Sequence, residues 1–292
     1  MVTTGSRPSG SAQNVVVLAG AETAGVTPVR HKRSMGWAKV TALAMGGSNQ
    51  SLFLIGALIA AQGSAGVPLL IAGVFLSWAA APGWLELVLM WPNRVGGIAA
   101  TCAEAFRPYS AVLANLTGVC YWWGWVPTCG LTAILSASAI HQWYLPWIPE
   151  APIAVVIVVA FTLVNLCGVG WVGRLAIPIA ACSAILALLS TVVPVIAGKV
   201  DWHHAVSFHL TSPFAGIFGG LTSLMAGLYL VGFAAPAFEA ALCHVGEMHD
   251  PNRSVPRALL ASAAMAGLYF VAIPIIMLGC CVPTPLVGDL AS

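Results

Sequence analysis

Long apolar runs recur along the chain from about residue 36 to its end, and they constrain the fold more than any other feature. Seven of them approach or exceed the roughly 20 residues that one helix needs to cross the hydrocarbon core of a bilayer. The composition agrees, because 59% of the residues are hydrophobic and only 7% are charged, against roughly 25% charged residues in soluble domains. The sequence therefore predicts an all-α integral membrane protein with spans at about 36–61, 66–91, 110–140, 152–170, 174–198, 215–243 and 257–282.

The basic residues lie almost entirely on one side of these seven spans. Lys199 is alone on the far side, whereas the N-terminal side holds Arg7, Arg30, Lys32, Arg33, Lys39, Arg94, Arg107, Arg174, Arg253 and Arg257. Cytoplasmic segments carry an excess of Lys and Arg, so this asymmetry predicts a cytoplasmic N-terminus in a multi-pass protein of the plasma membrane. Residues 1–35 have no core-forming pattern and are predicted to be a flexible cytoplasmic tail, with a cleaved signal peptide as the weaker alternative.

The middle of the first span is polar. Residues 45–53 read MGGSNQSLF, so a simple helix would point four polar side chains in four directions: Ser48, Asn49, Gln50 and Ser51. Gly46 and Gly47, directly before them, make unwinding cheap, and unwound backbone at membrane depth is tolerated where it is buried in protein or lines a cavity. One interpretation is hydrogen-bonding glue between helices. The other, which we favour, is a broken helix that forms a binding site.

The sixth span carries the same kind of interruption. Gly232 and Pro236 both weaken a helix, the first by backbone freedom and the second by removing a donor and clashing with the preceding turn. The freed backbone groups are expected to face a cavity where ions or substrate can satisfy them, and the nearby Glu239 is a functional candidate because ionisable residues inside membranes are expensive. A simple proline kink is the alternative for this span taken alone. Two interrupted helices five spans apart are typical of inverted-repeat transporters with a midplane site.

Signals for other protein classes lack a suitable setting. Residues 168–173 read GVGWVG, which matches a dinucleotide-binding fingerprint, but the apolar run before them is too long for a strand. Asp201, His203, His204 and His209 lack the spacing of a known metal site. We therefore predict no enzyme, no metal or other cofactor and no nucleic-acid partner. The predicted cytoplasmic N-terminus and the lack of any Lys in the seventh span also argue against a seven-helix receptor or a light-driven protein.

One loop resembles a known family. EMHDPNRSVPRA, residues 247–258, resembles the loop after the sixth span of amino acid permeases of the amino acid–polyamine–organocation superfamily. The matching residues are Glu247, Asp250, Pro251, Arg253, Pro256, Arg257 and Ala258. ELVLMWPNRVGG, which begins at Glu86, resembles the signature that closes the second span of that family, and Asn165 with Gly168 resembles its turn after the fourth span. The likeness covers about residues 36–282.

The resemblance implies a LeuT-like inverted-repeat fold with broken helices 1 and 6. It divides the chain into a first five-helix repeat at 36–198, an extracytoplasmic loop at 199–214 and the start of a second repeat at 215–292. Such permeases have about twelve spans, so the chain is expected to be a fragment or a truncated form that ends after the seventh.

The implied function is secondary transport of an amino acid or related amine by alternating access. The predicted substrate-binding residues are Gly46, Gly47, Ser48, Asn49, Gln50 and Ser51 in the first span and Gly232, Phe233, Ala234, Ala235 and Pro236 in the sixth. Glu86, Ser183 and Glu239 are coupling or gating candidates, with H+ or Na+ as the coupling ion; Ser183 stands where proton-coupled relatives often carry a lysine. The alternative is an accessory membrane subunit that needs a second chain to supply the missing helices.

Overall fold

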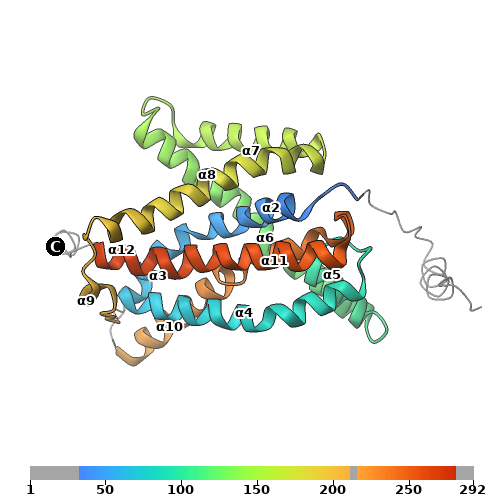
Figure 1. Ribbon diagram of the computed structural model, residues 1–292, viewed down its shortest axis with the longest axis horizontal. Coiled ribbons are helices and arrows are strands. Elements are labelled where there is room, and N and C mark those ends of the chain that lie inside the picture. Colours follow the sequence, from blue (N-terminus) through green and yellow to red (C-terminus); the bar gives the residue numbers. More distant parts are fainter. Residues whose placement is uncertain (1–32, 211–215, 281–292) are drawn as a thin grey trace, which may run out of the picture. The chain divides into compact units, whose positions relative to one another are not determined.

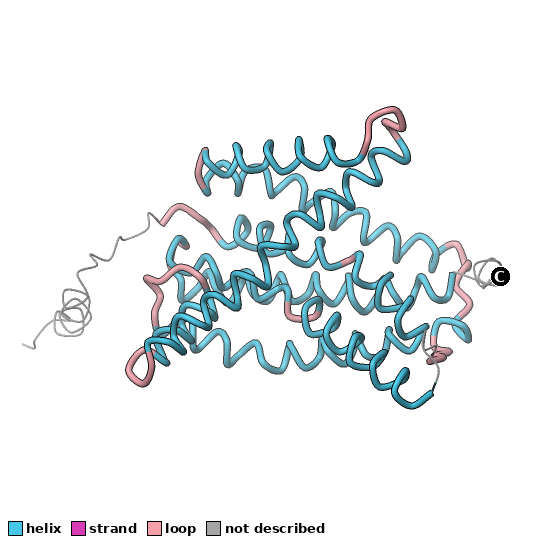
Figure 2. The backbone as a smooth tube through the Cα atoms, turned by 180° about the vertical axis from the view of Figure 1, so that it is seen from behind, coloured by secondary structure: helices cyan, strands magenta, loops and turns pink. Residues whose placement is uncertain are grey.

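The computed structural model describes residues 33–210 and 216–280, which form helices joined by short connections (Figure 1). Figure 2 shows no strand among them, and one isolated bridge pairs Met35 with Met248. The α-helices are α2 (Trp37–Ser51), α3 (Phe53–Gln62), α4 (Gly66–Met90), α5 (Gly97–Phe106), α6 (Ala111–Trp143), α7 (Glu150–Leu166), α8 (Val169–Ile196), α9 (Trp202–Ala205), α10 (Gly216–Ala234), α11 (Pro251–Gly267) and α12 (Ile273–Cys280). Two segments are 3₁₀-helical, η1 (Gly63–Ala65) and η2 (Ala237–Glu247), and η3 (Leu268–Ala272) is π-helical. The predicted all-α membrane fold is confirmed.

Each predicted span coincides with a helical segment. Four stretches of the described residues are long and apolar enough to cross a membrane: Trp37–Met90, Gly170–Ile196, Gly216–Glu247 and Pro251–Cys280. The first of them holds two predicted spans, because the chain turns at η1, where Gly63 has a φ of 66°, and α3 then packs on α4. α6 has 33 residues and α7 has 17. The short helix α5, between the second and third predicted spans, was not expected.

The interrupted spans contribute much of the buried core. α2 packs against α8, α11 and η2, while α3 packs against α10 and α4. The largest fully buried side chains include Phe238 on η2 and Tyr269 and Phe270 on η3. Helix α7 instead exposes apolar side chains such as Val156 and Phe161, which suits contact with lipid.

The sixth span is broken where its sequence predicts. α10 ends at Ala234, Ala235 and Pro236 form a turn, and the chain continues as the 3₁₀ helix η2. The backbone N–H of Glu239 donates to the carbonyl of Pro236 at 2.8 Å. Runs of 3₁₀ helix longer than three or four residues are uncommon and often mark a hinge, and η2 has 11 residues. Pro236 causes the change, because proline cannot donate to the preceding turn and clashes with it.

The predicted unwinding of the first span within Gly46–Ser51 is wrong. Helix α2 runs through these residues, and the only interruption is Leu52, whose φ of −59° and ψ of −37° are themselves helical. The physical reason is that part of the polar stretch finds partners without unwinding. Ser51 Oγ donates to the carbonyl of Gly47 at 2.9 Å, and the side chain of Asn49 is bonded across to α8.

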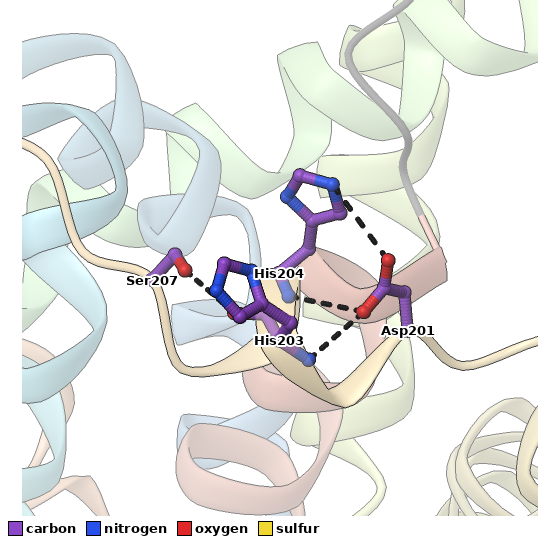
Figure 3. A network of polar contacts seen from close by, with 4 residues as sticks. All are labelled: Asp201, His203, His204 and Ser207. Carbon is purple, nitrogen blue, oxygen red and sulfur yellow. Dashed lines mark hydrogen bonds and ion pairs between the residues drawn. The ribbon is translucent and has the colours of Figure 1, made fainter.

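At one end of the bundle, the short helix α9 is fixed by one carboxylate (Figure 3). Oδ1 of Asp201 accepts from the backbone N–H of His203 at 2.9 Å and of His204 at 3.3 Å. These bonds hold the pKa of Asp201 below its usual value, because they favour the charged form. The backbone N–H of Asp201 in turn donates to the carbonyl of Gly279 on α12, so the loop after α8 is tied to the C-terminal end of the last described span.

At the opposite end, the start of the first span is held beside the end of the sixth. Arg33 donates to the carbonyl of Met248 at 3.3 Å and to Oδ1 of Asn93 at 2.9 Å. The backbone N–H of Met35 donates to the carbonyl of Glu247 at 3.1 Å. Residues 1–32 of the predicted tail lie outside the described residues, as does part of the predicted loop at 199–214. Residues 33–35, by contrast, pair with the end of η2.

Candidate functional site

A cavity of about 230 Å³ lies between α6 and the break of the sixth span. Its wall comes from the middle of α6 and from both sides of the break: Cys120, Tyr121, Gly124, Trp125, Gly232, Phe233, Pro236, Ala237 and Glu239. The break shapes this wall, because α10 contributes the residues before Pro236 and η2 those after it. The sequence predicted a cavity at the sixth span, and one lies there.

Glu239 is the acidic group of the cavity, and its side chain is only half satisfied. The residue is 7% exposed. Oε1 accepts from the hydroxyl of Tyr121 at 2.6 Å, while Oε2 is buried without a hydrogen-bond partner among the described residues. The same Tyr121 hydroxyl lies 3.2 Å from Sγ of Cys243. Buried polar groups normally have partners, so an unsatisfied carboxylate oxygen beside a cavity needs an explanation.

Aromatic rings form much of the remaining wall. The ring centroids of Trp125 and Phe233 lie 5.4 Å apart, and those of Trp125 and Tyr121 lie 6.3 Å apart. Trp125 also reaches the first span, because a Cβ placed on Gly47 would lie 3.1 Å from Cη2 of its ring and 3.4 Å from the carbonyl oxygen of Ala237. Gly47 therefore allows α2 to approach the back of this wall.

The predicted site residues of the sixth span divide into two groups. Gly232, Phe233 and Pro236 line the cavity. Ala234 and Ala235 do not, because their buried side chains face other helices of the bundle: Ala234 packs beside Leu58 and Leu70, and the Cβ of Ala235 lies 3.2 Å from the Cβ position of Gly73.

The polar stretch of the first span faces elsewhere. None of the residues Gly46 to Ser51 lines the cavity, although Gly47 touches the back of its wall. Oγ of Ser183 on α8 donates to Oδ1 of Asn49 at 2.9 Å and lies 3.1 Å from the hydroxyl of Tyr269. Asn49, Ser183 and Tyr269 thus join three spans, which matches the hydrogen-bonding glue that we considered the weaker interpretation. Oγ of Ser48 and Nε2 of Gln50 are buried without a partner among the described residues.

Glu86, a predicted coupling or gating residue, lies away from the cavity, whereas two residues that the sequence analysis did not select lie in its wall. Glu86 is exposed on α4 and does not line the cavity. Tyr121 and Trp125 were missed, although residues 119–126 read VCYWWGWV and place four aromatic residues within one predicted span. This aromatic cluster could have indicated the site, but aromatic residues in a span often only pack against other helices. Only the fold shows that Tyr121 contacts Glu239.

The arrangement suits a group that is both positively charged and partly apolar. A buried carboxylate oxygen can accept from an ammonium group, and aromatic faces attract cations at distances up to about 6 Å. The described lining contains no Lys, Arg or His. The cavity can therefore receive an amine but offers no basic side chain to a carboxylate.

The profile of the amino acid permease family matches residues 35–289. The chain is 29% identical over 251 residues to the L-asparagine permease of Salmonella typhimurium, covering 82% of this chain and 49% of that protein. It is 27% identical over 159 residues to the cadaverine/lysine antiporter of Escherichia coli strain K12, covering 53% of this chain and 34% of that protein. It is 25% identical over 156 residues to the D-serine/D-alanine/glycine transporter of Escherichia coli O6:H1, covering 49% of this chain and 31% of that protein.

No solved structure matches the chain significantly. The chain spans less than half the length of these curated relatives. The family profile nevertheless covers nearly all of the 292 residues, from 35 to 289. On that match, this chain belongs to the amino acid permease family.

Proposed function

We propose that this protein is a secondary transporter that moves an amino acid or a related amine across the plasma membrane by alternating access. The observation that carries the proposal is Oε2 of Glu239, a buried and unpartnered acceptor beside a cavity at a broken helix. Family membership supports a transporter rather than an enzyme. The substrates in the names of the relatives differ in size and charge, but each of them carries an amino group.

In this proposal the ammonium group of the substrate binds at Glu239, and Tyr121 keeps Oε1 occupied so that Oε2 faces the ligand. Trp125 and Phe233 shield the bound amine from lipid and water. A charged Glu239 carboxylate with neither substrate nor proton bound would be costly inside the membrane. We therefore propose that Glu239 binds a proton when the substrate leaves and releases it when the substrate binds. H+ is therefore the proposed coupling ion, and Na+ is the alternative. The distribution of Lys and Arg supports a cytoplasmic N-terminus.

The test is uptake by proteoliposomes that contain the purified product of the complete gene. A panel of labelled amino acids and of the amines formed by their decarboxylation is offered under an imposed pH gradient and, separately, under a Na+ gradient. Saturable uptake that follows the pH gradient supports transport and H+ coupling. Uptake that follows only the Na+ gradient rejects H+ coupling, and no uptake of any compound rejects the proposed function.

A further inference from the structure

The last residue of α3 reaches into the sixth span. The side chain of Gln62 is 2% exposed, and Nε2 donates to Oγ of Ser223 on α10 at 3.0 Å and also to the Ser223 carbonyl. Ser223 is 3% exposed, and its hydroxyl donates back to the carbonyl of Ala61 on α3. Hydrogen bonds thus run in both directions between two helices that lie far apart in the sequence.

The surface of α10 is shaped to receive this side chain. Gly227 lies one turn after Ser223, so both residues share one face of the helix. A Cβ on Gly227 would lie 2.9 Å from Cδ of Gln62 and 3.0 Å from its Nε2. Any larger residue at position 227 would have to displace the glutamine. Gln62, Ser223 and Gly227 therefore form one fitted contact, which we call the outer clamp.

The outer clamp joins helices that end at the two interruptions. α3 begins directly after Leu52, and α10 ends directly before Ala235 and Pro236. α3 packs on α10, whereas α2 packs on η2. The first span therefore consists of an inner half, α2, and an outer half, α3, and the sixth span of an outer half, α10, and an inner half, η2. The two outer halves pack on each other, and so do the two inner halves.

We infer that Gln62 is a positioning residue that makes α3 and α10 move as one body during transport. This inference rests on the proposed function, because it assigns the clamp a part in transport. Gly232 and Phe233, near the end of α10, line the cavity. The clamp therefore fixes the outer wall of the cavity to the outer half of the first span.

The first experiment is a double-mutant cycle on the transport rate. Gln62→Ala and Ser223→Ala are each expected to lower the maximal rate per inserted molecule by about three- to tenfold, the range that a hydrogen bond between membrane helices contributes to an equilibrium. The double variant is expected to be no slower than the slower single variant, because both changes remove the same contact. Ser262→Ala is the matched control, since Ser262 is equally buried but bonds only within α11. Independent, multiplicative effects would overturn the clamp.

The glycine provides a rescue test. Gly227→Ala is expected to slow transport because its Cβ crowds Gln62. Adding Gln62→Ala removes the atoms that clash, so the double variant should return to the rate of Gln62→Ala alone. A double variant slower than either single one would show that position 227 acts through some other contact and would overturn this part of the account.

A cross-link tests the shared motion. In a background lacking the eight native cysteines, Gln62→Cys and Ser223→Cys are joined by a short bifunctional thiol reagent. Helices that move together should keep at least half of the transport rate after cross-linking, whereas helices that move apart should be arrested. Arrest would overturn the inference.

The clamp and the proposed function can fail separately. If the unmodified protein transports nothing, the proposed function fails, and the cycle is then measured on thermal unfolding of the protein in detergent. Non-additive losses there would support the contact between Gln62 and Ser223, whereas additive losses would overturn it.

Discussion

Replacing Glu239 by Gln removes the charge of the cavity while keeping its shape. In the unmodified protein the hydroxyl of Tyr121 donates to Oε1 of Glu239 at 2.6 Å. The glutamine side chain still offers an oxygen to this hydroxyl. In place of the unpartnered Oε2 it presents an NH2 group, which donates where the carboxylate accepts. An ammonium group that enters the cavity then meets a donor instead of an acceptor.

The size of the effect follows from the kind of bond that is lost. A hydrogen bond to a charged group contributes about 1.5–3 kcal/mol, which corresponds to an increase in KM of about 10- to 150-fold. The assay is the initial rate of uptake by proteoliposomes across a range of substrate concentrations, repeated from acid to alkaline pH. Because glutamine exchanges no proton, the variant should also lose whatever part of the pH profile Glu239 supplies.

Glu150→Gln is the matched control, because Glu150 is an exposed carboxylate at the start of α7 and does not line the cavity. It should keep both the KM and the pH profile of the unmodified protein. If Glu239→Gln keeps them as well, Glu239 neither binds the amine nor carries the proton, and the reasoning from its unpartnered oxygen is refuted.

Three further predictions concern single groups. Gly47→Leu should abolish uptake while leaving the protein in the membrane, because even a Cβ added at this position would lie 3.1 Å from the ring of Trp125. Gly56→Leu is the control and should keep uptake, because there is open space around Gly56. Equal uptake by both variants would contradict this. Tyr121→Phe should lower the free energy of unfolding in detergent by about 1–3 kcal/mol, because it leaves the buried carboxyl group of Glu239 without its donor. Tyr229→Phe, at an exposed tyrosine, is the control and should not lower it. Equal losses in the two variants would contradict the prediction. The carboxylate of Asp201 has a lowered pKa, so its capping bonds persist above the usual value of 3.8 and are lost as the pH falls through the lowered pKa. The protection of the His203 amide against hydrogen exchange, measured relative to an unstructured peptide at the same pH, should fall there and in Asp201→Ala at any pH, but not in Asp201→Asn. Unchanged protection in Asp201→Ala would contradict the cap.

The sequence was most informative where a residue limits its own backbone. Pro236 cannot donate a hydrogen bond whatever surrounds it, and the sixth span breaks at that residue. The length and apolarity of the runs likewise predicted the helical segments. The loop motif at 247–258 predicted the family, and the family profile matches residues 35–289.

The sequence was least informative where the outcome depends on a partner. Gly46 and Gly47 permit unwinding but do not require it, and the helix stays wound because Asn49 finds Ser183 on α8. Tyr121 could not be assigned to the site from sequence, since only the packing of α6 beside η2 brings it to Glu239, more than a hundred residues later. The pairing of Gln62 with Ser223 is long-range in the same sense.

The most direct test of the central claim is substrate counterflow in proteoliposomes that contain the product of the complete gene. The vesicles are loaded with one unlabelled amino acid or amine at a time, and entry of the same labelled compound is followed without any ion gradient. Exchange transport and coupled transport both give counterflow, so the result does not depend on the coupling ion. The account predicts transient accumulation of at least one compound with a free ammonium group and its loss in Glu239→Gln. Absence of counterflow for every compound would contradict the claim that this protein carries amino acids or amines.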